Sequence, residues 1–239
     1  MLLEGKNAVA EALSAESTIE KILISKSSGD NDFISQIKAS GVQFQFVDKA
    51  VLDRHSKTGK HQGFIAFTTD YQYHDLAELI ESAYKKGSQP MFLALDGVQD
   101  PHNLGNIIRT AECMGVDGII IPKNRCVSVT ETVVRVSAGA TAHIPVSKVT
   151  NLNQEVEILK KKGFWIYAME AGGVNISKTN LTGPICVIMG GEDSGVRQLT
   201  KSLVDNIISI PMHGKINSLN VANATAMVLY EINRQRFCK

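Results

Sequence analysis

Asparagine and arginine side chains lie at fixed spacing in residues 96–111, directly after a short apolar run. A helix is predicted to begin near Asn103, a residue type that often caps helices, and it would place Asn106 and Arg109 near the same face. Amide and guanidinium groups donate hydrogen bonds, and a guanidinium stays charged at neutral pH, so these side chains can hold an oxygen atom of a ligand. An ordinary polar helix surface is an equally good interpretation of these residues alone.

A glycine pair followed by acidic residues comes after the apolar run 185–189: Gly190, Gly191, Glu192 and Asp193. Glycines let the backbone approach a ligand closely, as in phosphate-binding loops, but two carboxylates would repel a phosphate, and no Lys-Ser or Lys-Thr follows. A nucleoside without phosphate groups fits this stretch better. A glycine-rich turn with no ligand is the alternative.

Further polar side chains precede the last predicted helix. Ser218, Asn220 and Asn223 lie within six positions, and Ser218 or Asn217 is predicted to cap the helix. One cap does not account for all of these polar residues. The small and apolar residues 223–230 indicate tight packing, for which the protein's own core is the simplest partner and a dimer interface is the alternative.

Local positive charge gathers in residues 49–61, where the basic side chains outnumber the acidic ones. Nucleic acids are bound by clustered Lys and Arg rather than by overall charge, so this segment is the best candidate for contact with RNA phosphates in a chain of formal net charge +1. From charge alone, a solvated loop is the simpler interpretation. The predicted RNA-binding residues are Arg54, Lys57, Lys60 and His61.

The 239 residues are 44% hydrophobic and 21% charged, as in soluble globular proteins, and no apolar stretch reaches the ~18 residues that span a membrane. The amino-terminal residues lack a secretory signal pattern, so we expect a cytoplasmic protein. The four Cys form no CxxC pair and the six His show no metal-binding spacing. Nothing in the sequence requires a metal ion.

Helical and strand-like patterns alternate over the first ~70 residues and predict a small α/β module. A helix-like stretch at 75–86 follows, and the domain boundary is placed between residues 69 and 90. Apolar runs then alternate with helical patterns, which predicts a mostly parallel sheet covered on both faces. Ligands of such sheets bind in loops beyond the carboxyl ends of the strands. The predicted strands are residues 92–95, 118–121, 144–149, 164–169, 185–189 and 207–210.

Taken together and in this order, the three polar loops resemble the three motifs of the SpoU/TrmH family of SPOUT RNA 2′-O-methyltransferases. Residues 136–140, 149–152 and 231–236 extend the resemblance to the bacterial 23S ribosomal RNA guanosine-2′-O-methyltransferases. One departure is the run Val221-Ala222-Asn223, where many relatives have Ser and Val at the last two places. The resemblance covers almost all of the predicted catalytic domain.

Residues 5–13 and 61–63 are similar to the substrate-binding domain of that subgroup, a module that resembles ribosomal protein L30e. The resemblance therefore implies an RNA-binding domain at 1–70, a linker at 71–90 and a methyltransferase domain at 91–239. It also implies a homodimer formed by the catalytic domain and a deep trefoil knot at the carboxyl terminus. Knots are essentially absent among protein folds, so physical reasoning alone would not predict one.

By resemblance, S-adenosylmethionine is bound largely by backbone groups of Gly190, Ile210 and Leu219, and Gly191 and Met212 line the same pocket. The residues that match the family's catalytic positions are Asn103, Arg109, Glu192, Ser218 and Asn220. Arg109 is the family's proposed proton acceptor. This role is chemically difficult, because a guanidinium normally keeps its proton, so Arg109 is equally well placed to stabilise the developing alkoxide or to hold an adjacent phosphate.

The implied reaction is 2′-O-methylation of a guanosine ribose in 23S ribosomal RNA. Methylation of a tRNA nucleotide is the main alternative, although the tRNA-modifying subgroup usually lacks the amino-terminal module. A non-catalytic RNA-binding scaffold is a second alternative, and loss of the catalytic positions would be its signature. A nicotinamide-dependent oxidoreductase would need a GxGxxG motif after the first strand, and the sequence has none.

Overall fold

The chain is described here from a computed structural model. It covers residues 2–14, 18–69, 71–87, 89–191, 195–216 and 218–237, without the side chains of Thr18 and Thr69. The candidate catalytic residue Glu192 and the predicted cap Asn217 lie outside the described residues. The chain divides into two compact units: Met1–Gln72 with Val127–Glu131, and Tyr73–Cys126 with Thr132–Lys239.

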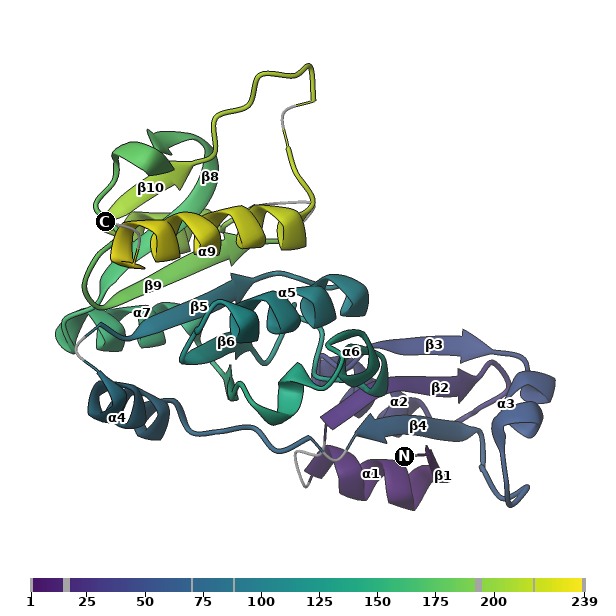
Figure 1. Cartoon of the computed structure of the whole chain (residues 1–239). Helices are drawn as coiled ribbons and strands as arrows, with labels where there is room; N and C mark the ends of the chain where they lie inside the picture. The colour runs from purple at the N-terminus through teal and green to yellow at the C-terminus, as the bar shows by residue number, and fades with distance from the viewer. Residues whose placement is uncertain are drawn as a thin grey trace. The chain divides into compact units, whose positions relative to one another are not determined.

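The smaller unit is built on a four-stranded sheet with the order β1-β4-β2-β3 (Figure 1). β4 pairs antiparallel with both β1 and β2, whereas β3 pairs parallel with β2. These strands and the helices that connect them are β1 (Leu2–Glu4), α1 (Lys6–Ser14), β2 (Thr18–Ser25), α2 (Asn31–Ala39), β3 (Phe44–Val47), α3 (Lys49–His55) and β4 (Phe64–Thr69).

Two apolar cores form because strand side chains alternate between the faces of this sheet. Ile22 and Ile24 of β2 pack with Phe33 of α2 on one face, together with residues of α1. Leu23 points to the other face and packs with Leu52 of α3. The single-residue alternation along β2 therefore places helices on both faces of the sheet.

The basic segment 49–61 is not the solvated loop that its charge alone predicts. Its first half is the helix α3, whose buried Leu52 anchors it to the sheet. Seven residues with one fully buried side chain give too short an apolar pattern to distinguish a helix from a loop in the sequence. Only residues 56–63 form the loop that leads into β4.

The larger unit contains a six-stranded sheet with the order β10-β8-β9-β5-β6-β7, and every neighbouring pair in it is parallel. All residues of β5 and β6 are buried, as expected for parallel strands covered on both faces. The prediction of an α/β fold with a parallel sheet is confirmed. The strands are β5 (Met91–Asp96), β6 (Gly118–Pro122), β7 (Val146–Val149), β8 (Trp165–Asn175), β9 (Ile185–Gly190) and β10 (Asn206–Ser209).

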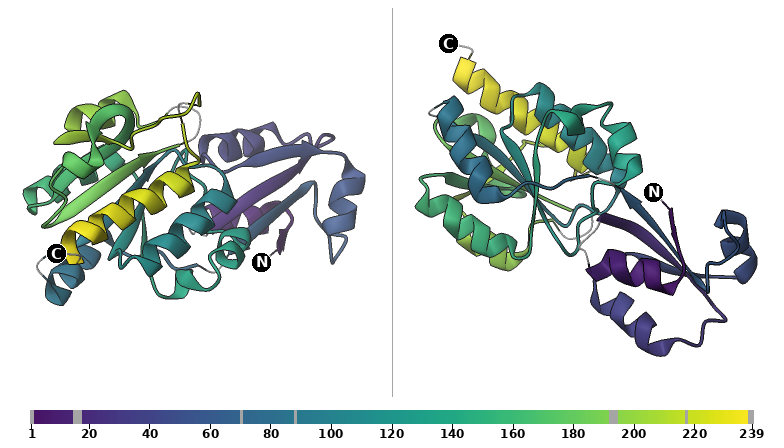
Figure 2. Two further views of the ribbon diagram at one scale, coloured as in Figure 1. Left: turned by 45° about the horizontal axis from the view of Figure 1, so that its top comes forward. Right: turned by 90° about the horizontal axis from the view of Figure 1, so that it is seen from below.

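Helices cover the two faces of this sheet. Buried residues of α4 and α7 pack on one face with alternate residues of β5, β8 and β9, and Leu203 of α8 joins them. α5 and α9 lie side by side on the other face (Figures 1 and 2). The helices are α4 (Leu76–Lys86), α5 (Pro101–Cys113), α6 (Glu131–Val136), α7 (Leu152–Lys161), α8 (Gln198–Leu203) and α9 (Val221–Phe237), with short 3₁₀ turns η1 (Ala140–Ala142) and η2 (Ile176–Lys178).

The segment predicted to link two domains, 71–90, is largely structured. Asp75 caps α4 by accepting a hydrogen bond from the Glu78 amide at 3.1 Å, and Leu76 and Ile80 are buried in the core of the larger unit. Most side chains of this helix are polar, because only a narrow apolar stripe contacts the sheet. The sequence of such a helix is therefore easily interpreted as a linker.

The end of the chain crosses the larger sheet. β10 is the edge strand beside β8, and the chain then returns toward β9, where α9 packs against α5. Such a return from the edge to the centre is the crossover that the trefoil knot needs, and the knot itself stays a prediction. No helix among the described residues is both long and apolar enough to cross a membrane.

Candidate active site

The first two polar loops meet at the carboxyl ends of adjacent strands. Asp96 of β5 lies opposite Gly190 of β9, and the Gly191 amide donates a hydrogen bond to the Asp96 carbonyl at 3.0 Å. A Cβ atom at Gly191 would overlap the carbonyl oxygen of Gly97, and one at Gly190 would overlap the backbone of Gly195. The glycines are thus required first by the close contact of protein backbone with protein backbone, rather than by a ligand.

Asp96 fixes these loops through a buried ion pair. Its side chain is 2% exposed and accepts hydrogen bonds from the Arg197 amide at 3.1 Å, Arg197 Nε at 2.7 Å and Thr200 Oγ1 at 3.0 Å. A carboxylate with three donors is fully engaged in the free protein. Asp96 therefore holds the start of α8 against the end of β5.

The third loop contacts the first through two candidate catalytic residues. Asn220 Nδ2 donates to Asn103 Oδ1 at 2.9 Å, although 117 positions separate them in the sequence. Asn220 Oδ1 also accepts from the Ala222 amide at 2.9 Å, which makes Asn220 the cap of α9. The prediction that Ser218 or Asn217 caps this helix is therefore wrong for Ser218.

Helix α5 begins at Pro101, and Asp100 caps it by accepting from the His102 amide at 2.8 Å. The prediction that Asn103 is the cap is wrong, because Pro is favoured in the first turn and lets the helix start earlier. Positions three apart also drift around a helix by about 60°. Asn103 is accordingly buried, at 8% exposure, whereas Asn106 and Arg109 are exposed.

A cavity of about 450 Å³ lies beside the carboxyl end of β9 and the middle of β8 in the larger unit. All five predicted cofactor-binding residues line it, as do Ser218 and Asn220, whereas Asn103 is behind Asn220 and Arg109 is not among the lining residues. The lining residues are Met169, Glu170, Ala171, Met189, Gly190, Gly191, Gly195, Ile210, Met212, Ser218, Leu219, Asn220, Val221 and Ala224.

Sequence reasoning missed the contribution of β8, which supplies Met169, Glu170 and Ala171 to the cavity. The predicted strand stops at residue 169, whereas β8 continues to Asn175 with a shift in register opposite Ile207 and Ile208 of β10. The signal was present as a second glycine pair at 172–173, which follows the apolar run 164–169 after two residues. A glycine pair inside a strand often marks such an irregularity.

The cavity is apolar with a single carboxylate among its described lining residues, and none of them is Lys or Arg. That carboxylate, Glu170, forms an ion pair with Lys201 at 3.3 Å. Its lining is poorly suited to a phosphate and well suited to a nucleoside, whose flat ring needs apolar walls and whose edges need backbone donors and acceptors.

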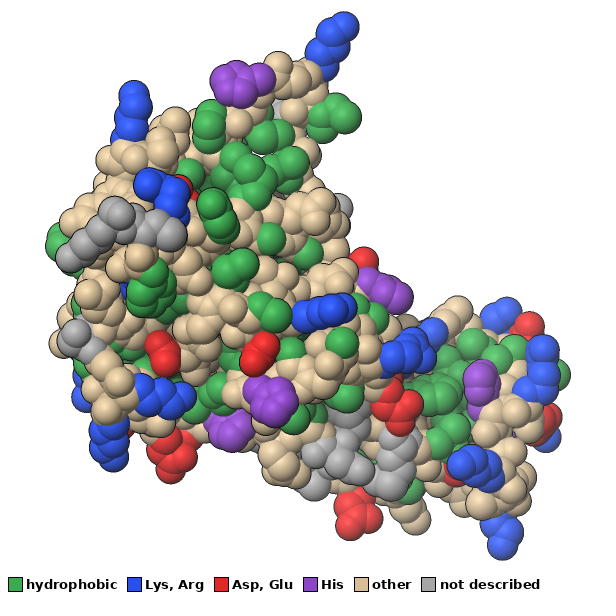
Figure 3. Space-filling view, in the orientation of Figure 1, with side chains coloured by type: hydrophobic (Ala, Val, Ile, Leu, Met, Phe, Trp, Pro, Cys, Tyr) green, Lys and Arg blue, Asp and Glu red, His purple; other side chains and the backbone are tan. Residues whose placement is uncertain are grey.

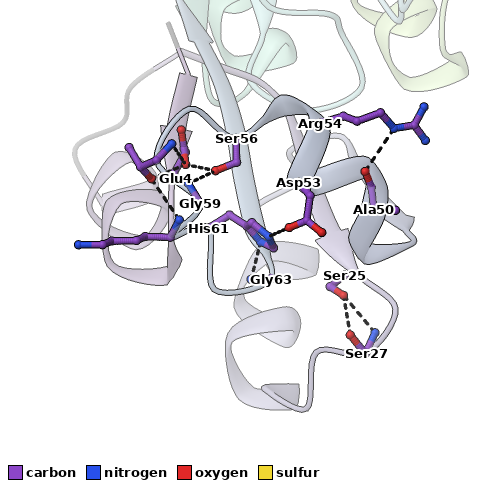
Figure 4. A network of polar contacts seen from close by, with 12 residues as sticks. Glu4, Ser25, Ser27, Ala50, Asp53, Arg54, Ser56, Gly59, His61 and Gly63 are labelled. Carbon is purple, nitrogen blue, oxygen red and sulfur yellow. Dashed lines mark hydrogen bonds and ion pairs between the residues drawn. The ribbon is translucent and has the colours of Figure 1, made fainter.

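The predicted RNA-binding residues lie in the smaller unit, and the close-up in Figure 4 shows the polar contacts of Arg54 and His61. Lys57 and Lys60 are exposed, and Arg54 donates from Nε to the Ala50 carbonyl at 3.2 Å. His61 differs, because it is 4% exposed and both ring nitrogens are engaged, with Asp53 at 2.9 Å and with the Gly63 amide at 3.0 Å. Its contribution is to hold the loop in shape.

Glu4 holds the other end of this loop. Its carboxylate accepts from the Ser56 hydroxyl, from the Lys57 amide at 2.7 Å and from the Thr58 hydroxyl at 2.7 Å. These hydrogen bonds, first those from Ser56 and Thr58, lower the pKa of Glu4 to about 2, so it is ionised at neutral pH.

On the face shown in Figure 3, Lys and Arg side chains are scattered rather than gathered in one continuous basic surface. An RNA contact on this face would therefore use local groups.

Comparison with known proteins agrees with this geometry. The SpoU rRNA Methylase family matches residues 90–230, and the family described as RNA 2'-O ribose methyltransferase substrate binding matches residues 2–74. The curated protein "Putative TrmH family tRNA/rRNA methyltransferase YacO" of Bacillus subtilis is 39% identical over 237 residues, which is 97% of this chain and 94% of that protein.

Two solved structures are similar in fold. An rRNA methyltransferase from Sinorhizobium meliloti, solved with bound AdoMet, has a TM-score of 0.61 and 25% identity, over 98% of this chain and 86% of that one. A TrmH/SpoU tRNA modifying enzyme from A. aeolicus has a TM-score of 0.58 and 30% identity, over 67% of this chain and 82% of that one. With both family matches and a relative that is similar over nearly its whole length, the chain belongs to the SpoU/TrmH family of tRNA/rRNA methyltransferases.

Proposed function

We propose that this chain transfers a methyl group from S-adenosylmethionine to the 2′-hydroxyl of a guanosine ribose in 23S ribosomal RNA. The observation that carries the proposal is the cavity beside β8 and the end of β9, whose wall includes Asn220 in contact with Asn103. It joins a nucleoside-sized apolar space to a pair of polar side chains from two of the three polar loops.

The described residues fit the cofactor. Apolar side chains such as Met189 and Ile210 suit the adenine ring, and backbone groups at Gly190 and Leu219 suit its edges. When bound, S-adenosylmethionine supplies a methyl group on a positively charged sulfur, and the Glu170 carboxylate is the one charged group among the described lining residues. Because Glu170 is already paired with Lys201, it is the lack of Lys and Arg among the described lining residues that suits a ligand without phosphate groups.

The chain's own residues position the hydroxyl and manage its proton. Ser218 and Asn220 line the cavity with a hydroxyl and an amide that can orient a ribose oxygen, and Asn103 fixes the Asn220 amide. Arg109, exposed on α5, stabilises the developing alkoxide or holds the neighbouring phosphate with its permanent charge. The proton then passes to another group, for which Glu192 is the proposed candidate.

Ribosomal RNA is favoured over tRNA as the substrate by the extent of the structural match. The solved rRNA methyltransferase matches 98% of this chain, including the smaller unit, whereas the tRNA modifying enzyme matches 67%. Residues 2–74 match the substrate-binding family, and this unit is not needed for the match to the tRNA enzyme. Its presence points to a larger, folded RNA, which proteins recognise mainly by shape.

The proposal is tested by incubating the full chain with labelled S-adenosylmethionine and separate pools of 23S RNA, 16S RNA and tRNA from cells that lack the protein. We expect label in 23S RNA, at one guanosine whose ribose resists alkaline cleavage on its 3′ side. Label confined to tRNA would mean that tRNA, not 23S RNA, is the substrate. Label on a base would mean that the enzyme does not methylate the ribose. Binding of RNA and cofactor without transfer to any pool would favour the scaffold alternative.

We also propose that α9 contributes to a homodimer interface. Met227 and Tyr230 lie three positions apart on one face of α9 and are 47% and 63% exposed, and the neighbouring loop exposes Met212 and Ile216. Large apolar side chains grouped at the surface commonly mark contacts between proteins. Since Met212 also lines the cavity, association there would border the cofactor site.

The double variant Met227→Glu/Tyr230→Glu is expected to be monomeric, because two carboxylates would have to be buried without partners. Sedimentation velocity measures the fraction of dimer, and labelled cofactor measures methyl transfer. We expect both quantities to fall in the double variant. Leu199→Glu on α8, where the side chain is 65% exposed, is the matched control and should leave assembly unchanged. A double variant that sediments as the parent protein does would exclude this face.

A further inference from the structure

A second concave site lies in the smaller unit and shares no lining residue with the cofactor cavity. It has a volume of about 510 Å³ and lies between the turn after β2 and the loop before β4. Ser25, Ser27 and Ser28 line one side, and Lys49 and Lys60 contribute the charge. We call these five residues the serine–lysine site.

The serine–lysine site offers hydrogen-bond donors that the protein itself does not use. Ser25 and Ser27 share one hydrogen bond between their hydroxyl oxygens at 2.8 Å, so one of the two hydroxyl protons remains available. The Ser28 hydroxyl and the ammonium groups of Lys49 and Lys60 have no hydrogen-bond or ion-pair partner within the part of the chain that the structure describes.

Carboxylates near the site are engaged elsewhere, so its charge is positive. None of the described lining residues is acidic. Asp53 is bound to His61, Glu4 is bound to residues 56–58, and Asp48 forms an ion pair with Lys26 at 3.1 Å. Two unpaired ammonium groups beside hydroxyl donors match an anion with several acceptor oxygens.

The loop that closes the site is held in place by the contacts in Figure 4. His61 accepts a hydrogen bond from the Gly63 amide, and Gly63 has a φ of +86°, a conformation that glycine adopts without strain. A Cβ atom at Gly63 would lie 3.5 Å from Ser25 Cβ and 3.6 Å from Ser28 Cβ. Glycine at this position therefore keeps the loop closely packed against the serine turn.

We propose that the serine–lysine site binds a phosphodiester group of the RNA backbone. This inference rests on the proposed function, in which RNA is the substrate. No Phe, Tyr or Trp is among the described lining residues, and the one ring there, that of His61, is 4% exposed and bonded at both nitrogens, so the site offers little surface on which a base could stack. Phosphate oxygens, in contrast, accept from hydroxyl and ammonium donors alike. Phosphate contacts of this kind fix the position of an RNA without reading its sequence.

The test measures the affinity of the full chain for deproteinised 23S RNA over a series of salt concentrations, without turnover. Lys49→Gln/Lys60→Gln should weaken binding about tenfold and reduce the slope of log Kd against log salt by about 1, because one phosphate contact is lost. Ser28→Ala should weaken binding by roughly threefold with the slope unchanged, because it removes a donor and no charge. The KM for RNA in methyl transfer should rise in each variant in step with its loss of RNA affinity.

Lys38→Gln and Ser35→Ala, both at exposed positions of α2, are the matched controls and should behave as the parent chain. If the lysine variant weakened RNA binding and Ser28→Ala did not, the lysines would attract RNA only through their charge. The proposed phosphate site would then be wrong. Inorganic phosphate that protects Lys60 from acetylation while 23S RNA does not would assign the site to a free anion instead. If RNA binding responds as expected but no RNA is methylated, the site stands and the proposed function fails.

Discussion

Replacing Arg109 by Ala is expected to lower methyl transfer on the order of 100- to 1,000-fold, the usual cost of losing one donor that stabilises a developing negative charge. The side chain is exposed on α5 and makes no hydrogen bond or ion pair within the described residues, so the substitution removes no contact that holds the fold. Cofactor affinity should also be retained, because Arg109 does not line the cavity. Single-turnover transfer to 23S RNA measures the effect.

Two further variants separate the chemistry of Arg109 from its charge. Arg109→Lys keeps a positive charge but loses the planar fork of donors, so recovery of most activity would mean that charge alone is sufficient. Arg135→Ala removes an equally exposed helical arginine and serves as the control. An Arg109→Ala protein that binds cofactor and methylates RNA at the parent rate would remove Arg109 from the mechanism.

The positions of the polar loops were predictable because the apolar runs that precede them indicate parallel strands. Fully apolar runs such as β5 and β9 are typical of parallel strands buried on both faces, and loops at their carboxyl ends must meet at one edge of the sheet. Gly190, Ile210 and Leu219 line one cavity, and their part in cofactor binding stays a prediction.

Local hydrogen bonding was less predictable, because several residues compete for each cap. Asn103 and Asn220 looked alike as polar residues near helix starts, yet Asp100 caps α5 and Asn220 caps α9. The choice depends on Pro101, which lets α5 begin early, and on the tertiary contact between the two asparagines. A contact across 117 positions leaves no local pattern in the sequence.

The serine–lysine site was missed for a related reason. Charge drew attention to Lys57 and Lys60, but Ser25, Ser27 and Ser28 lie more than twenty positions earlier and read as an ordinary turn. The antiparallel pairing of β2 with β4 brings the end of one strand beside the start of the other. Only the register of that pairing, with Ile24 opposite Phe64, places the serine turn against the loop.

Gly191→Ala is expected to abolish cofactor binding, with affinity reduced at least about 100-fold. Its Cβ would overlap the Gly97 carbonyl oxygen and lie 2.6 Å from the carbonyl carbon, so backbone at the end of β5 must move. Gly191 itself lines the cavity, and overpacking against backbone costs about 1–3 kcal/mol or more. The melting temperature should therefore also fall, by roughly 2–10 °C for a unit of this size. Calorimetric titration with S-adenosylmethionine, well below the melting temperature, measures the affinity.

Gly87→Ala is the matched control, because nothing lies within 4 Å of the added Cβ and its φ of −178° is ordinary extended backbone. It should bind the cofactor and melt as the parent chain does. If Gly191→Ala lost stability but kept its affinity, the contact between the loops would serve folding and the cavity would not depend on it. Unchanged stability and affinity together would show that the loops can separate without cost, contrary to the close packing of Gly191 on Gly97. The glycine pair would then have to be explained by the cofactor itself. The cofactor would approach the backbone of Gly190 or Gly191 closely, while the added Cβ of residue 191 would find space on the side of Gly97.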